Sequence, residues 1–142
     1  LSANGSIVAY SSPTYEEGTG VVYVHHLDPE TGDWTLMGGT ALHGGTKKNR
    51  FGSCLSLSSD GSRLAVGSSP PLAVGIRVDN NSSGFVRVFH WNGKEWTKMT
   101  KDIVGDVENY LGEDCSLVGS RLAVGSFTYN DTTGLVRVFD LL

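Results

Sequence analysis

Three pairs of neighbouring acidic residues are the parts of this sequence whose types could share general-acid and general-base work. They are Glu16 with Glu17, Asp106 with Glu108, and Glu113 with Asp114. Each pair lies in a polar, loop-like stretch, where a solvated carboxylate is the ordinary state. No pattern typical of a catalytic nucleophile, a zinc site or a phosphate loop accompanies them. The sequence therefore predicts no catalytic residue and no cofactor, and we expect the chain not to be an enzyme.

Oxygen-bearing side chains alternate in residues 79–84, Asp-Asn-Asn-Ser-Ser-Gly, as they do at the start of a calcium-binding loop. The distal glutamate that completes such a loop is missing. Residues 130–134, which occupy the equivalent place later in the chain, do not begin with Asp. We interpret both stretches as polar loops that end at the glycine where a strand begins, and we predict no metal site in them.

Composition and charge exclude several classes of partner. The 142 residues carry a formal net charge of -4, and the only dense basic cluster is Lys47, Lys48 and Arg50. Nucleic acid is not an expected partner, because affinity for it depends on clustered positive charge that neutralises phosphates. No apolar stretch approaches the roughly 20 residues that span a bilayer, so we expect no membrane span in this segment.

A repeated sequence pattern predicts the strands on which the acidic and polar loops are placed. The heptapeptide Ser-Arg-Leu-Ala-Val-Gly-Ser occurs at residues 62–68 and again at 120–126, and a weaker copy lies at residues 5–12. A glycine-led apolar strand follows each copy, and the last two of these strands share Val-Arg-Val-Phe. The copies are spaced by about 60 residues, an interval that is typical of a repeat architecture.

Each full repeat is predicted to contain four short strands. In the middle copy we expect them at residues 54–58, 63–67, 84–91 and 95–99, with Ser59-Asp60-Gly61 turning the first pair. Four antiparallel strands per repeat is the pattern of a β-propeller blade, and a two-layer sandwich is the rival explanation.

Side-chain alternation along the glycine-led strand of the middle copy places Val86 and Val88 on one face and Phe89 on the other. Both faces are therefore apolar, and such a sheet must be covered on both sides. Another column of these strands holds residues that could bind a metal, His26, His90 and Asp140. They belong to different repeats, so we expect them to face solvent separately instead of converging on one ion.

By this count the chain is an all-β protein, a partial β-propeller of about 2.5 four-stranded antiparallel blades. Residues 1–52 form an incomplete blade and a connector, residues 53–112 a complete blade and a connector, and residues 113–142 an incomplete blade. A closed propeller needs about four to eight blades. We therefore expect a fragment whose outer apolar faces are covered by neighbouring blades of the full-length chain.

The sequence resembles the FG-GAP repeats of integrin α-subunit propellers across nearly the whole chain. Phe51-Gly52 matches the FG pair, Val66-Gly67-Ser68 stands in the place of GAP, and a glycine-led strand follows from Gly84. Leu111-Gly112 occupies the place of the FG pair one repeat later. The resemblance implies a scaffold for adhesion or protein binding.

Calcium-binding members of the family carry an Asp-rich loop between the first two strands of a blade. Here that place holds Ser59-Asp60-Gly61-Ser62 and, one repeat later, Leu117-Val118-Gly119-Ser120. One carboxylate cannot supply the six to eight oxygen ligands that a calcium ion takes. We therefore predict a tight hairpin turn in place of the calcium site of the family.

Two observations bear on the compartment of the protein. Cys54 and Cys115 can pair only if the fold brings their strands together, and their spacing leaves that question open. Asn80, Asn81 and Asn130 lie in Asn-x-Ser/Thr patterns, which accept glycans in a eukaryotic secretory pathway. We expect an extracellular or cell-surface protein.

The connections between the second and third strands of each repeat differ in length. They span residues 11–19, 69–83 and 127–133, and varied loops on a constant frame are where scaffolds carry recognition. The longest of them is the candidate contact surface, and its candidate residues are Pro70, Pro71, Leu72, Val74, Ile76 and Arg77. The alternative is a longer connector that packs on its own blade.

Two functions remain open. The first is a non-catalytic repeat scaffold for a protein or carbohydrate ligand within a larger secreted or cell-surface protein. The alternative is a fragment of a carbohydrate-active propeller, similar to glycosidases or sialidases, whose catalytic residues lie outside this segment. Trp34, Trp91 and Trp96 recur with the hairpins. They predict packing between blades, with sugar stacking as the other interpretation.

Overall fold

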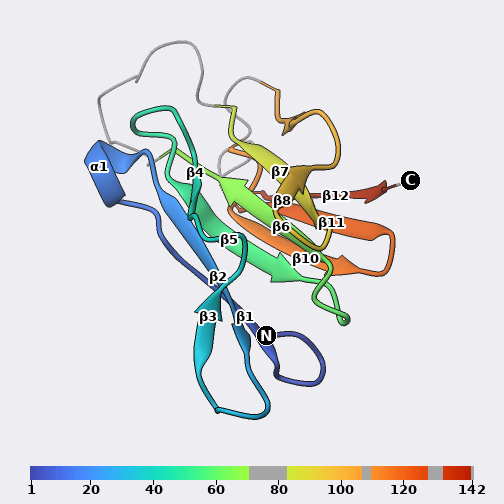
Figure 1. The fold of residues 1–142 in the computed structure, drawn as a ribbon. Coiled ribbons are helices and arrows are strands. Elements are labelled where there is room, and N and C mark those ends of the chain that lie inside the picture. The colour runs from blue at the N-terminus through green and yellow to red at the C-terminus, as the bar shows by residue number, and fades with distance from the viewer. Residues whose placement is uncertain (71–82, 107–109, 128–132, 142) are drawn as a thin grey trace.

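The computed structural model describes residues 1–70, 83–106, 110–127 and 133–141, which form three antiparallel sheets with almost no helix (Figure 1). The prediction of an all-β fold is confirmed. One helical element occurs in these residues, the four-residue turn α1 (Tyr15–Gly18). Over the described ranges no helix has the length and apolar character needed to cross a bilayer.

The first sheet contains β1 (Ile7–Ser12), β2 (Val21–Leu27) and β3 (Trp34–Leu36) in that order. The short strand β4 (Leu42–His43) also pairs with β2. Valine and other apolar residues dominate β2, as is typical of a strand that is packed on a core.

The second sheet runs in the order β5 (Phe51–Leu57), β6 (Arg63–Ser68), β7 (Phe85–Trp91) and β8 (Trp96–Lys98), and β9 (Ile103–Val104) pairs with β7. The four strands that the sequence predicts in the middle repeat are thus confirmed, with ends shifted by up to three residues. The two-residue strands β4 and β9 were not predicted. They form where a connector runs beside β2 or β7, and a pairing that short leaves no alternation in the sequence.

The third sheet contains β10 (Asp114–Val118), β11 (Arg121–Ser126) and β12 (Leu135–Asp140). Strand β11 carries the second copy of the heptapeptide, and β6 carries the first. The residue pairs at the start of the three equivalent ladders are Ile7 with His26, Arg63 with His90, and Arg121 with Asp140. The column of His26, His90 and Asp140 is therefore confirmed, with each member exposed on a separate sheet.

The turn between β5 and β6 is closed by its own side chains. The hydroxyl of Ser58 donates to Oδ1 of Asp60 at 2.6 Å, and the backbone N–H and hydroxyl of Ser62 donate to the same oxygen at 3.0 and 2.9 Å. These bonds, led by that from Ser58, lower the pKa of Asp60 to about 2. In the first repeat Asn4 stands in its place and accepts the two bonds from Ser6. The predicted hairpin turn is confirmed.

The first and second sheets share one apolar core. Val22 and Val24 of β2 pack with Leu64 and Val66 of β6, and Phe51 at the start of β5 is buried among them. Each of these five side chains is at most 3% exposed. This packing of two sheet faces makes the second sheet a layer on top of the first.

The second and third sheets share a core built from the equivalent residues. Val86 and Val88 of β7 occupy the places of the β2 valines, and they pack with Leu122 and Val124 of β11. Phe89 points to the opposite face and joins the core of the first and second sheets. The predicted alternation along β7 is confirmed, and the second sheet is covered on both faces.

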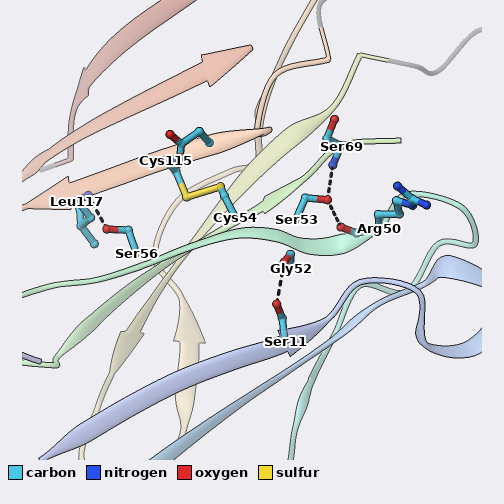
Figure 2. The surroundings of a disulfide bond; sticks show 10 residues. Ser11, Arg50, Gly52, Ser53, Cys54, Ser56, Ser69, Cys115 and Leu117 are labelled. Atoms are coloured by element: carbon cyan, nitrogen blue, oxygen red, sulfur yellow. Dashed lines mark hydrogen bonds between the residues drawn. A yellow bond between two sulfur atoms is a disulfide. The ribbon is translucent and has the colours of Figure 1, made fainter. Parts of the chain in front are cut away.

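A disulfide links the first strands of the second and third sheets (Figure 2). Cys54 of β5 and Cys115 of β10 have their Cα atoms 5.9 Å apart, and the Cys54 side chain is buried. Next to the disulfide, the backbone N–H of Leu117 donates to the hydroxyl of Ser56 at 2.8 Å. The pairing that the sequence leaves open is decided by the fold, because β5 and β10 lie side by side.

The second and third sheets also approach one another at a glycine. A Cβ atom added to Gly67 in β6 would run into the sulfur of Cys54 and the backbone oxygen of Gly112. The equivalent residue of the third sheet is Gly125 in β11. Its nearest neighbours would lie at 3.7 Å or more, which is ordinary van der Waals contact. Two glycines from the same heptapeptide therefore differ in what surrounds them.

We expect Gly67→Ala to lower the free energy of unfolding by about 1–3 kcal/mol, because the added methyl group has no room beside the disulfide. The matched control is Gly125→Ala, which should be neutral or raise it by about 0.5–1 kcal/mol, since alanine loses less backbone entropy than glycine. Urea unfolding followed by circular dichroism measures both. Equal effects of the two substitutions would contradict the close approach at Gly67.

We expect replacement of both cysteines, Cys54→Ser with Cys115→Ser, to lower the free energy of unfolding by about 4 kcal/mol. This is the chain-entropy value for a crosslink across a separation of 61 residues. The control is the wild-type chain under dithiothreitol, whose urea midpoint should fall to that of the double variant. If the oxidised wild-type chain has the same urea midpoint as the reduced chain and the double variant, no disulfide forms.

Candidate binding end of the sheets

In the first two sheets, the start of the strand that comes third in the repeat, β2 or β7, lies beside the connector that leads to the next sheet. We call this end of the sheets the loop end. Backbone hydrogen bonds between equivalent glycines hold the two connectors at this end. The N–H of Gly44 donates to the oxygen of Gly20 at 3.2 Å, and the N–H of Gly105 donates to that of Gly84 at 3.1 Å. Of the candidate contact residues named from the sequence, Pro70 is described, and it belongs to this end.

In the first repeat, the connection between β1 and β2 contains α1 and is bound to the connector that follows β4. The backbone N–H of Lys48 donates to the oxygen of Glu17 at 3.1 Å, and that of Arg50 donates to the oxygen of Gly18 at 2.8 Å. Lys47 and Glu17 also form an ion pair at 3.0 Å. Both of its side chains are largely exposed, so it contributes little to stability. The basic cluster of Lys47, Lys48 and Arg50 lies in a loop.

A pocket of about 250 Å³ opens at the loop end between the first connector and the ends of β6 and β7. Small and polar residues form most of its wall, among them Thr46, Asn49, Ser68 and Ser83. Pro70 also lines it and is itself buried. Of the candidate contact loop, Pro70 is therefore placed at a concave surface.

The rest of the candidate contact loop lies outside the described residues, as do the predicted glycosylation sites. These positions are Pro71, Leu72, Val74, Ile76, Arg77, Asn80, Asn81 and Asn130. For the contact loop and for the glycans, the sequence-based interpretation stays a prediction.

An ion pair forms part of the pocket wall. Arg87 of β7 donates through Nε and Nη2 to the two oxygens of Asp102, at 3.0 and 2.9 Å, and Lys98 lies 2.7 Å from the same carboxylate. The Arg87 guanidinium also stacks on Phe51 and Phe85, at 5.4 and 5.2 Å from their ring centres. The hydrogen bond from Arg87 does most to lower the pKa of Asp102, and Lys98 adds to it.

The sequence analysis missed this ion pair. The Val-Arg-Val-Phe motif that two repeats share was the available signal, because an arginine recurs between two valines in it. In the third sheet the equivalent Arg137 pairs with Asp106 at 2.7 Å. The partner acids lie on either side of β9, in the connector between β8 and β10, and their distance from the arginines cannot be read from spacing.

Several of the acidic residues that could act as acids or bases have structural partners in the described part of the chain. Asp114 begins β10, so the prediction of a loop is wrong at that residue. Glu17 pairs with Lys47, and a carboxylate oxygen of Glu113 accepts the N–H of Phe127 at 2.6 Å. Asp114 accepts the N–H of Cys115 at 2.8 Å. Across the described residues no three His, Cys, Asp or Glu side chains are grouped so that they could hold a metal ion.

The tryptophans divide between packing and exposure. Trp96 packs against the core of the first and second sheets, and Trp91 lies 5.5 Å from it, ring centre to ring centre. Trp34 occupies the equivalent place in the first sheet and is 44% exposed. The packing predicted for Trp34 stays a prediction, because no described sheet lies opposite that face of β3.

We expect Asp102→Asn to lower the free energy of unfolding by about 2 kcal/mol at pH 7, because Arg87 loses a charged, two-point partner. The pKa of Asp102 is lowered by folding, so its contribution is full above the unfolded value near 3.8 and is lost as the pH falls below it. Urea unfolding from pH 7 to pH 2.5 should show the two proteins converging in acid.

The matched control is Glu17→Gln, which removes an ion pair whose two side chains are largely exposed. It should change stability by less than about 0.5 kcal/mol at either pH. A pH-independent difference between the wild type and Asp102→Asn would contradict the role of the charge.

Comparison with known proteins adds no relative. No protein-family model matches the chain, and a search of the curated proteins finds no match to it. The function is therefore argued from the geometry of the sheets and of the loop end.

Proposed function

We propose that this chain is part of a β-propeller that acts as a non-catalytic binding scaffold, of the protein-binding or adhesion type, in a larger secreted or cell-surface protein. The observation that carries the proposal is the repetition of one sheet-to-sheet interface. Valines of the first sheet pack on the leucine and valine of the second, and the equivalent valines of the second pack on the equivalent pair of the third.

A repeated head-to-tail interface applies the same rotation at every step, and such a series closes into a ring when the rotation divides a full turn. Propellers are rings of this kind, built from four-stranded antiparallel sheets. A two-layer sandwich, the rival interpretation, has only two sheets, each with one face on a shared core. A middle sheet covered on both faces supports the propeller.

The disulfide supports the proposed location. Cys54 and Cys115 join two sheets in the apolar interior, and structural disulfides of this kind are typical of oxidising compartments. The predicted glycosylation patterns at Asn80, Asn81 and Asn130 point in the same direction.

The proposed binding surface is the loop end. Its strand ends are held by backbone hydrogen bonds to the connectors, so loops of different length stand on a rigid base. The polar pocket beside Pro70 adds a concave surface at the root of the longest loop. A protein or carbohydrate ligand fits a surface of this kind.

We expect immobilised protein to support cell adhesion, and we expect exchange of residues 70–83 for the shorter segment 128–133 to reduce adhesion at least about tenfold. Pretreating the cells with protease or with glycosidases separates a protein ligand from a carbohydrate ligand. The control is the urea midpoint of the exchanged chain, which should stay within about 1 kcal/mol of the wild type, because loop length changes stability slowly.

Adhesion that survives the loop exchange would contradict the loop end as the binding surface. Hydrolysis of fluorogenic glycosides by the full-length protein would instead favour the carbohydrate-active alternative, in which the catalytic residues lie on other blades.

A further inference from the structure

The outer face of the third sheet is apolar and uncovered. Val118, Val136 and Val138 are 68%, 70% and 66% exposed, and we call these three residues the valine face. Val136 and Val138 are the repeat equivalents of Val86 and Val88 in the second sheet, which are fully buried. Isolated exposed valines are ordinary on a protein surface, but a face whose counterparts are core residues points to a missing neighbour.

A hollow lies beside the valine face. It measures about 480 Å³ and has a mostly apolar lining that includes Gly125, Gly134, Leu135 and Val136. Gly125 is the repeat equivalent of Gly67, whose neighbour is the backbone of Gly112. The hollow therefore lies where the other interface holds a connector.

The glycines that precede β2, β7 and β12 also indicate a missing neighbour beside the third sheet. In the second sheet, Gly84 has φ +63°, and the backbone of Leu111 occupies the place of its Cβ. In the first sheet, Gly20 has φ +78°, and the backbone of Phe51 does so. Gly134 has the same φ of +78°, yet its nearest neighbour is an atom of its own sheet at 3.6 Å, the oxygen of Ser126.

We propose that the valine face and the hollow bind a further sheet of this repeat, supplied by the same polypeptide. Its connector would insert an aromatic residue or leucine followed by glycine, as Phe51-Gly52 and Leu111-Gly112 do. Its second strand would place a leucine and a valine on Val136 and Val138. This inference rests on the proposed stacked scaffold. It adds which residues the further sheet would contribute and the surface on which that sheet would pack.

The outer face of the first sheet is a poor substitute as the occupant. In the places where the second sheet has Val66, Arg87 and Phe89, it carries Tyr10, Tyr23 and His25, which stack with ring centres 5.3 and 5.6 Å apart. Tyr10 is also 49% exposed. Val8 stands in the place of Leu64, but the valine that covers the valines elsewhere is replaced by Tyr10 and its polar aromatic stack. A second copy of the chain is therefore not the occupant that we propose.

The test is a chain in which residues 92–142 are repeated once after Leu141. In the repeat, Leu141 stands in the place of Trp91, so the added segment continues with the Asn-Gly turn and carries its own Leu-Gly connector and third sheet. We expect exchange of the β12 amides with solvent to slow about tenfold, and binding of the apolar dye anilinonaphthalene sulfonate to stay near that of the shorter chain.

The matched variant is Gly125→Ala in the first of the two copies. In the 142-residue chain it should leave the urea midpoint unchanged or raise it, because an added Cβ meets only ordinary contacts. In the extended chain the same methyl group would meet the inserted glycine. The protection of β12 should then fall back at least about fivefold toward its value in the shorter chain.

Two results would overturn the inference. The first is a Gly125→Ala substitution without effect in the extended chain, together with β12 amides that exchange as fast as in the shorter one. The second is concentration-dependent association of the 142-residue chain that Val136→Asp abolishes, which would assign the valine face to a second copy. Adhesion through the loop end does not need the further sheet and would survive either result, so failure of this inference is distinguishable from failure of the proposed binding role.

Discussion

Adjacent sheets in this protein approach one another so closely that backbone meets backbone, and only glycine leaves room for that contact. The Phe51 backbone lies against Gly20, the Leu111 backbone against Gly84, and Gly112 against Gly67. The valine, leucine and phenylalanine cores between the sheets can form only because these approaches are permitted. Burial of those side chains then supplies the main stabilisation of the stack.

Polar interactions refine the same interfaces. The disulfide joins β5 to β10, and on the other side of β5 the hydroxyl of Ser11 donates to the oxygen of Gly52 at 2.8 Å (Figure 2). Strand β5 thus contacts both neighbouring sheets. Arg87 pairs with Asp102 and stacks on Phe51, so it ties the third strand of the second sheet to its first strand and to the connector that leads to the third sheet. These contacts join the second sheet to its neighbours on both faces.

Local structure was predictable wherever a short pattern carries its own geometry. The heptapeptide predicts β6 and β11, and the Ser-x-Asp-Gly-Ser turn closes through bonds among near neighbours. The pairing of Cys54 with Cys115 and that of Arg87 with Asp102 were not predictable, because sequence spacing does not report the distance between strands of different sheets. The packing predicted for Trp34 stays a prediction for the same reason, since its burial depends on which sheet lies opposite β3.

The sequence by itself determined the all-β class, the repeat, the strands of the middle sheet and the alternation that places Val86 and Val88 on one face. Only the tertiary structure decided which equivalent positions are buried. Val86 and Val136 stand in the same four-residue motif and in equivalent strands, yet one is fully buried and the other is 70% exposed. The physical reason is that strand conformation depends on neighbours along the chain, whereas burial depends on which sheet lies opposite.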